Sequence, residues 1–127
     1  MNNQEAQKLC DYIDASPSAF HAVEQAEAML KAKGAQRLDE GQAWKLDPGS
    51  SYYVVRDSAS LIAFRMGTLP PHESGFALSG AHSDFPGLRA RLEKAVSAKG
   101  FERVAVEAYG GPIHATWTDR PLSLAGR

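Results

Sequence analysis

The sequence has little cysteine, almost no net charge and no long apolar run. Cys10 is the only cysteine among 127 residues, which excludes a disulfide framework and a cysteine-rich zinc site. The formal net charge of −1 gives no electrostatic footprint for nucleic acid or an anionic membrane. No run approaches the roughly 18 apolar residues of a membrane span, and the N-terminus has no signal-peptide pattern. We therefore expect a cytoplasmic protein, in which any metal is held by histidine and carboxylate.

The length and composition predict a folded globular chain. Hydrophobic residues make up 43% and charged residues 23% of the sequence, as in ordinary soluble domains. A chain of 127 residues is long enough to bury a real core. Internal repeats and glycine-rich phosphate loops are absent. We expect residues 1–127 to form a single domain.

Two amphipathic helices are predicted at the N-terminus. Residues 4–15 place apolar side chains at i, i+3, i+4 and i+7. A second helix is predicted from Ala19 to Lys33, with Ser18 as N-cap and Gly34 as the C-terminal stop. His21, in the first turn of this helix, is interpreted as a packing or surface histidine.

The middle of the chain predicts three strands. Aromatic and β-branched residues favour a hairpin of Ser51–Arg56 and Ser60–Met66, with a turn at residues 57–59. A polar loop over residues 67–74 contains His72, which we expect to be solvated. The apolar run Gly75–Ala81 then predicts a buried strand.

The last third of the sequence alternates strand and loop signals. Its predicted elements are a strand over Leu88–Leu92, a loop over Glu93–Gly100, a strand over Phe101–Tyr109 and a short strand over Ile113–Thr118 with His114. The first of these strands carries Arg89 and Arg91 on one face. That face is either a solvated edge or, as the less favoured interpretation, a site for anions.

These elements together predict an α/β fold. Two N-terminal helices precede a mixed, largely antiparallel sheet, with its core in the strands between residues 51 and 81 and in Phe101–Tyr109.

A histidine and an aspartate follow the predicted buried strand. His82 and Asp84 are two residues apart, so in an extended chain both side chains leave the same face. One imidazole nitrogen can then bind a metal while the carboxylate fixes the other nitrogen. In open α/β sheets, ligands bind at the carboxyl ends of strands. A lone H-x-D is a weak motif, and such a pair is also common in solvated turns.

Four stretches in order resemble the aspartyl-aminopeptidase type of zinc aminopeptidases. Residues 15–22 (ASPSAFHA) resemble the family's S-P-x-P-F-H segment, and residues 80–86 (GAHSDFP) resemble its G-A-H-T-D-S-P metal motif. Residues 107–111 (EAYGG) and 116–127 (TWTDRPLSLAGR) resemble its E-x-Y-G-G and W-F-D-R-D-L-S-L-A-G-R segments. The resemblance covers nearly the whole chain, and it implies the start of a zinc-peptidase catalytic domain.

The resemblance implies a two-metal peptidase that removes N-terminal residues, often acidic ones, from peptide substrates. His82 would be a zinc ligand, and Asp84 would be the catalytic-site carboxylate that orients it. The metals would polarise the scissile carbonyl and activate water, with a glutamate as general base. Family members also assemble into large oligomers, so we expect a homo-oligomer or binding to the missing C-terminal portion of the enzyme.

The chain departs from the family pattern in sequence and in length. Ala19, Phe85, Gly87, Thr118 and Pro121 replace the residues that are usual at their positions. Family members are much longer, and their remaining ligands and paired glutamates follow the point at which this sequence ends. The chain alone is therefore expected to be inactive.

Three interpretations remain open at this stage. The chain is a part of a metalloaminopeptidase, a non-catalytic relative that serves as an interaction or assembly module, or an unrelated α/β binding domain. Four ordered matches argue against the third. The sequence assigns no role to Asp119.

Overall fold

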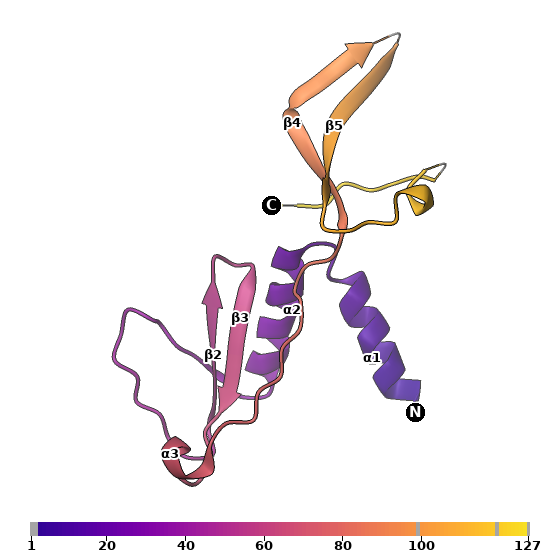
Figure 1. The fold of residues 1–127 in the computed structure, drawn as a ribbon. Helices are drawn as coiled ribbons and strands as arrows, with labels where there is room; N and C mark the ends of the chain where they lie inside the picture. Colours follow the sequence, from indigo (N-terminus) through magenta and orange to yellow (C-terminus); the bar gives the residue numbers. More distant parts are fainter. Residues whose placement is uncertain (1–2, 99, 119, 127) are drawn as a thin grey trace. The chain divides into compact units, whose positions relative to one another are not determined.

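The chain folds into two compact units, each with its own sheet (Figure 1). The computed structural model describes residues 3–98, 100–118 and 120–126. The first unit is built from the described residues up to Asp84 together with Ala125 and Gly126, and the second from Phe85–Leu124. The expectation of a single domain stays a prediction.

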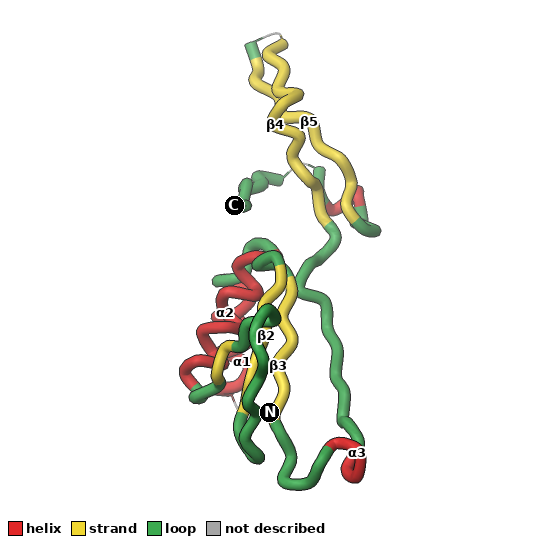
Figure 2. The backbone as a smooth tube through the Cα atoms, turned by 90° about the vertical axis from the view of Figure 1, so that its left-hand side faces the viewer, coloured by secondary structure: helices red, strands yellow, loops and turns green. Residues whose placement is uncertain are grey.

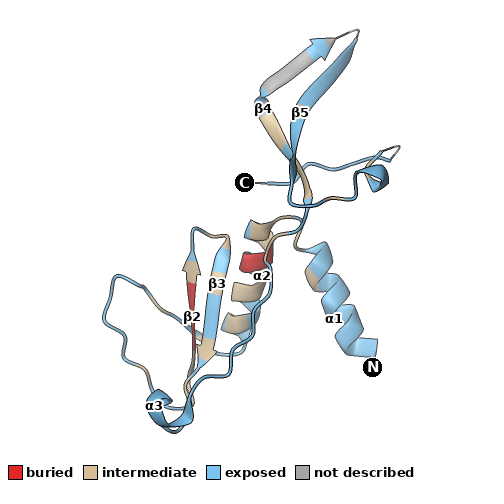
Figure 3. Cartoon of the chain, in the orientation of Figure 1, coloured by how far each residue is buried: buried red, intermediate tan, exposed pale blue. Residues whose placement is uncertain are grey.

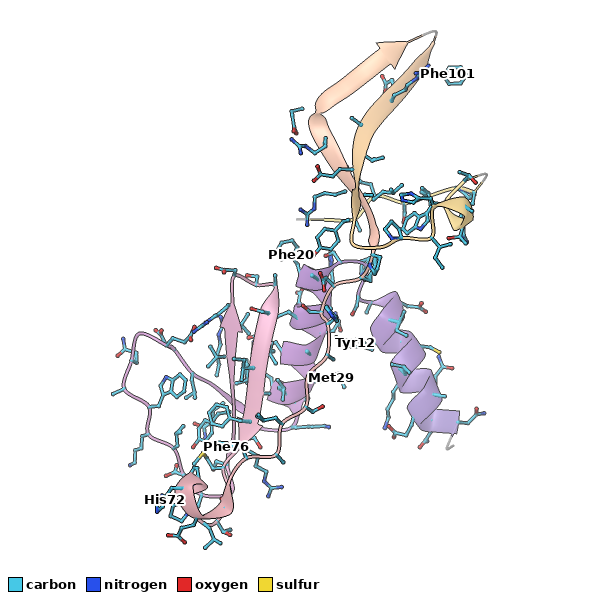
Figure 4. The ribbon with its side chains drawn as sticks, viewed as in Figure 1. Tyr12, Phe20, Met29, His72, Phe76 and Phe101 are labelled. Atoms are coloured by element: carbon cyan, nitrogen blue, oxygen red, sulfur yellow. The ribbon has the colours of Figure 1, made fainter. Side chains whose placement is uncertain are left out.

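Helices α1 (Asn3–Asp14) and α2 (Ala19–Ala32) confirm the two predicted N-terminal helices. Gly34 ends α2 as predicted, with a φ of +79°. The Gly34 and Ala35 amides donate to the last carbonyls of the helix, those of Lys31 and Leu30, in a Schellman arrangement. The Tyr12 hydroxyl donates to the Ala22 carbonyl at 3.0 Å and joins α1 to α2 (Figure 4).

The first sheet has the strand order β1-β2-β3, formed by Gln36–Arg37, Ser51–Arg56 and Ser60–Arg65. β1 pairs in parallel with β2, and β2 pairs antiparallel with β3 from Ser51↔Arg65 to Arg56↔Ser60. The predicted hairpin is confirmed. Its turn places Asp57 and Ser58 in the left-handed region, at φ values of +50° and +56°, which matches the right-handed twist of the strands.

The core is small and centres on β2, as Figure 3 shows. Its buried apolar residues are Ala22, Val23, Tyr52, Tyr53 and Val54. Because successive side chains of a strand alternate, Tyr53 meets α2 while Tyr52 packs on Phe64 at 5.7 Å between ring centroids. Trp44 stacks on Phe64, so the connection before β2 contributes to this second face.

Glu27 joins α2 to both β1 and β2. Its Oε1 atom accepts hydrogen bonds from Lys31 at 3.0 Å, Arg37 at 3.1 Å and the Tyr53 hydroxyl at 3.2 Å. The Lys31 hydrogen bond, with help from Tyr53 and Arg37, holds the pKa of this carboxyl below its ordinary value. Burial, together with the bond to Glu27, raises the pKa of Tyr53. The folded state therefore favours ionised Glu27 and neutral Tyr53.

The buried strand predicted over Gly75–Ala81 is wrong for this structure. After the short helix α3 (Pro71–Ser74), residues 75–86 form no helix or strand. Phe76 and Leu78 are 78% and 92% exposed. An apolar sequence becomes a strand only when a neighbour takes up its backbone hydrogen bonds, and none of the described strands pairs with this stretch.

The second unit consists of a long hairpin and a short helical turn (Figure 2). β4 (Gly87–Ala98) and β5 (Phe101–Tyr109) pair antiparallel, with an irregularity between Arg91 and Val96. The strand at Phe101–Tyr109 is confirmed, but it forms its own sheet with β4 instead of joining the first one. Its residues are mostly exposed, including Phe101 at the tip (Figure 4).

Two further predictions for this unit are wrong. The stretch expected as a loop over Glu93–Gly100 continues β4 to Ala98, because pairing with β5 outweighs its polar composition. The short strand expected over Ile113–Thr118 is instead a 3-10 helix, His114–Thr116, which forms local hydrogen bonds where none of the described strands pairs with it.

Arg89 and Arg91 interact with protein groups of the hairpin. The Arg89 guanidinium lies 4.4 Å from the centroid of the Tyr109 ring. Arg91 bonds to Glu93 at 2.8 Å and Glu107 at 2.9 Å. These contacts support the structural interpretation of this face over an anion site.

The fold class is confirmed as mixed α/β, with helices that precede sheet. Within the described residues, no helix is both long and apolar enough to cross a membrane.

We expect Glu27→Gln to destabilise the first unit by about 1 kcal/mol at neutral pH, with allowance for screening at the exposed Lys31 and Arg37. Because the folded pKa of Glu27 is lowered, its contribution is present above the ordinary pKa of 4.5 and is lost as pH falls through the lowered value. Denaturant unfolding at neutral and acidic pH measures the difference. Glu24→Gln, an exposed change on the same helix, is the control. Equal effects of the two variants at neutral pH would contradict this assignment.

Candidate metal centre

The candidate metal-binding residues follow the exposed stretch 75–81 and lie beside the β2–β3 turn. The Ser83 hydroxyl donates to the Ala59 carbonyl at 2.8 Å. Ala59 belongs to the turn between β2 and β3, so this bond ties the candidate residues to the hairpin. Ser83 is a positioning residue that the sequence does not predict, because a serine in a turn gives no signal of a partner 24 positions away.

His82 and Asp84 lie together, as their spacing predicted. His82 Nδ1 is 3.1 Å from Asp84 Oδ1, with side-chain exposures of 92% and 37%. A carboxylate favours the tautomer in which Nδ1 carries the proton, and that tautomer leaves Nε2 as a lone-pair donor. The pair thus has the chemistry of an oriented imidazole ligand. Its role as a metal site stays a prediction.

The other histidines of the described residues have separate surroundings. His21 Nδ1 pairs with the Ser18 hydroxyl at 2.8 Å, and His72 Nε2 is 3.5 Å from its neighbour Glu73. His114 opens the 3-10 helix of the second unit. Asp119 lies outside the described residues. In the part of the chain that the structure describes, no three histidine, cysteine or acidic residues are grouped to hold a metal.

The donor set fits one position of a zinc site. Zinc accepts neutral imidazole and carboxylate, but its sites use three or four protein ligands. His82 supplies one nitrogen, and Asp84 is already turned toward the other side of the ring. The described residues therefore provide one ligand with its orienting partner, and a complete site needs further donors.

A cleft of about 450 Å³ lies elsewhere in the first unit, between α2 and the sheet. Its lining includes His21, Glu24, Glu27 and Arg37. Glu27 and Arg37 bond to each other, and His21 bonds to Ser18. These three polar side chains therefore bond to one another or to the N-cap of α2, as packing residues do. Neither His82 nor Asp84 lines the cleft.

Comparison with known protein families shows the family to which the chain belongs. The family model described as aminopeptidase I zinc metalloprotease (M18) matches residues 12–127. The chain belongs to the M18 family. This result confirms the resemblance drawn from the four sequence segments, all of which lie within the matched range.

Two bacterial relatives show how much of the M18 chain is represented. A probable M18 family aminopeptidase 2 of Pseudomonas paraeruginosa is 49% identical over 121 residues, which are 95% of this chain and 28% of the relative. The corresponding protein of Azotobacter vinelandii is 44% identical over the whole chain and 30% of its own length. The chain thus spans under a third of these relatives.

Solved M18 structures share the fold. The crystal structure of yeast aminopeptidase 1 matches with a TM-score of 0.82 and 28% identity, over 92% of this chain and 28% of that one. A structure of the S. cerevisiae mApe1 dodecamer gives 0.81 and 28% identity, over 91% and 27%. Aminopeptidase I from Borrelia burgdorferi, at 17% identity and a TM-score of 0.71 over 95% and 31%, supports the fold alone.

We expect Asp84→Asn to change the tautomer of neutral His82. The carboxylate accepts only, so it stabilises the Nδ1–H form, whereas an asparagine amide can donate to Nδ1 and favour the Nε2–H form. One exposed hydrogen bond of about 0.5–1.5 kcal/mol corresponds to a change of about two- to tenfold in the tautomer ratio. The nitrogen chemical shifts of the imidazole rings measure this ratio at an alkaline pH at which imidazole is neutral. His72 is the internal control. An unchanged ratio at His82 would disprove the orienting role of Asp84.

Proposed function

We propose that this chain supplies one zinc ligand, His82, and its orienting carboxylate, Asp84, to the active site of an M18 aminopeptidase. The observation that carries the proposal is the 3.1 Å contact between these side chains within a family-matched stretch. The family's description as zinc metalloproteases supports zinc as the metal.

Three residues of the chain have distinct tasks in this proposal. The Asp84 carboxylate accepts a hydrogen bond from the protonated Nδ1 of His82, which leaves Nε2 free of a proton as the ligand atom. Ser83 holds the backbone between them against the β2–β3 turn. Zinc, when bound, supplies Lewis-acid activation of a carbonyl and lowers the pKa of bound water. Removal of Asp84 is expected to weaken metal binding without removal of a ligand.

The remaining functions are assigned to the part of the M18 chain that these residues do not span. A two-metal site needs several more carboxylate and histidine ligands and a glutamate as general base. The proposal includes a peptide substrate with a free N-terminus, often an acidic one, and inactivity of this chain alone. It also keeps the cytoplasmic location expected from the sequence.

The proposal further includes assembly, as a homo-oligomer or with the remainder of the enzyme. A relative solved as a dodecamer supports it, as do the exposed apolar side chains of Phe76, Leu78 and Phe101. The same surfaces fit the alternative of a non-catalytic interaction module. The two functions differ in one outcome: only a part of a metalloaminopeptidase gains aminopeptidase activity when the remaining ligands are supplied.

We expect the isolated chain to bind zinc weakly. One oriented imidazole cannot approach the binding free energies of about 10–16 kcal/mol that structural zinc sites reach. Calorimetry with zinc should give low affinity, weakened further by His82→Ala and little changed by His72→Ala. Tight one-to-one binding that survives His82→Ala would show that the metal site lies elsewhere.

We expect aminopeptidase activity only when the missing ligands are supplied. Co-expression with the remainder of the Pseudomonas paraeruginosa relative should give zinc-dependent release of N-terminal residues, measured on aminoacyl substrates. His82→Ala should abolish it, and Asp84→Asn should lower it about 10–100-fold, as for other partners of metal-bound histidines. His72→Ala is the control. Activity of the isolated chain, or an active complex with His82→Ala, would refute the proposed role.

A further inference from the structure

The cleft between α2 and the first sheet does not include the candidate metal ligands, yet it has the size of a small-molecule site. Its volume of about 450 Å³ lies within the range of about 300–1,000 Å³ that is typical of such sites. All of its lining residues belong to the first unit, including Gly126. The metal centre therefore gives no account of this cleft.

The α2 wall of the cleft carries a carboxylate that the fold leaves open. Glu24 lines the cleft, is exposed, and makes no hydrogen bond or ion pair within the described residues. It precedes Glu27 by three positions on α2, so the β-carbons of the two residues are about 5–6 Å apart. Glu27 is occupied by three donors, whereas Glu24 is available to a positively charged group of a ligand.

The same cleft contains a guanidinium with unused donors. Arg37 bonds to Glu27 through Nη1 at 3.1 Å, its one side-chain bond within the described residues. A guanidinium has five N–H donors, and this bond uses one of them. The Arg37 side chain is 55% exposed, so its other donors are accessible from the cleft. They can hold a carboxylate in the paired geometry typical of arginine.

We propose that this cleft binds a free α-amino acid with an apolar side chain. The α-ammonium of the ligand would pair with Glu24 and its α-carboxylate with Arg37. Because Arg37 lies against Glu27, the neighbour of Glu24 on α2, one small zwitterion can reach both groups. A ligand with a single charge would leave one of the two groups without a partner.

The apolar part of the lining selects the side chain of the amino acid. Phe20, in the first turn of α2 (Figure 4), and Val23 line the cleft on the helix side, and Val55 lines it on the β2 side. Contact with these residues removes apolar surface of the ligand from water, which favours an aliphatic side chain over a charged one. Leucine is therefore the test ligand.

An amino acid is also what an aminopeptidase releases. The cleft would thus hold a product of the proposed reaction at a second site, away from the metal ligands. This source of the ligand rests on the proposed function and deepens it. The binding itself requires neither zinc nor His82.

Titration of this chain with three ligands, followed by amide NMR shifts, tests both charges. L-leucine has both charged groups, N-acetyl-L-leucine lacks the ammonium, and L-leucinamide lacks the carboxylate. Leucine should bind at least about threefold more tightly than either of the others, with shifts in α2 and β2. Absence of leucine binding, equal affinity for the three ligands, or shifts confined to residues outside the cleft would overturn the proposal.

Two variants assign the charges to residues. Glu24→Gln should weaken binding of leucine and leucinamide at least about threefold and leave N-acetyl-leucine unchanged. Arg37→Lys keeps a cation beside Glu27 but loses the paired donors, so it should weaken leucine and N-acetyl-leucine and leave leucinamide unchanged. Glu73→Gln, at an exposed carboxylate of α3 outside the cleft, is the matched control.

Thermal melts separate these effects from loss of folding. Because Glu24 is exposed, Glu24→Gln should melt like the parent chain. An equal loss of affinity for all three ligands in Glu24→Gln, or no loss for any of them, would overturn the proposal.

A third variant separates this site from the proposed function. His82→Ala should keep leucine binding, while it abolishes the aminopeptidase activity of the complex with the remainder of the relative. Leucine binding by a parent chain whose complex is inactive would refute the function and leave the cleft site standing. An active complex whose chain does not bind leucine would refute the cleft site alone.

Discussion

The contact of Glu27 with Tyr53 and Arg37 connects the helical and sheet parts of the first unit. The core has only a few buried residues, so apolar burial alone holds α2 to the sheet over a small area. Glu27 adds a carboxylate that accepts three donors, two of them from β1 and β2. The Glu27 side chain is 16% exposed. At such a position, loss of its hydrogen-bond partners costs more free energy of folding than at the surface. The position of the β2–β3 hairpin depends on this junction.

The hairpin in turn places the candidate metal ligand. Its turn presents the Ala59 carbonyl, and Ser83 bonds to that carbonyl between His82 and Asp84. This turn is tight and holds two left-handed residues. Residues 75–81, which precede His82, are by contrast exposed over their whole length. The candidate site is therefore held at the turn through Ser83, whereas residues 75–81 on its other side pair with none of the described strands.

Local signals were sufficient to predict the helices, the hairpin and the contact of His82 with Asp84. Each depends on residues close in sequence: the Gly34 stop, the β-branched run before Arg56, the i, i+2 spacing. The errors arise where distant partners decide. Residues 75–81 have strand composition but pair with none of the described strands, whereas Val96–Ala98, in a stretch of loop composition, pair with β5. Ser83 and Glu27 were missed for the same reason, because their partners are far along the chain.

The unpaired stretch and the incomplete metal site are connected through His82. A metal ligand must be held within about 0.5 Å of its working position, by packing and neighbouring hydrogen bonds. One hydrogen bond at Ser83, worth about 1 kcal/mol, does not fix an imidazole that is 92% exposed. None of the described strands pairs with residues 75–81, so sheet hydrogen bonds do not hold the backbone immediately before His82. In the proposed enzyme, the further zinc ligands would therefore also have to hold His82 in its working position, so zinc affinity would rise only when the rest of the site is present.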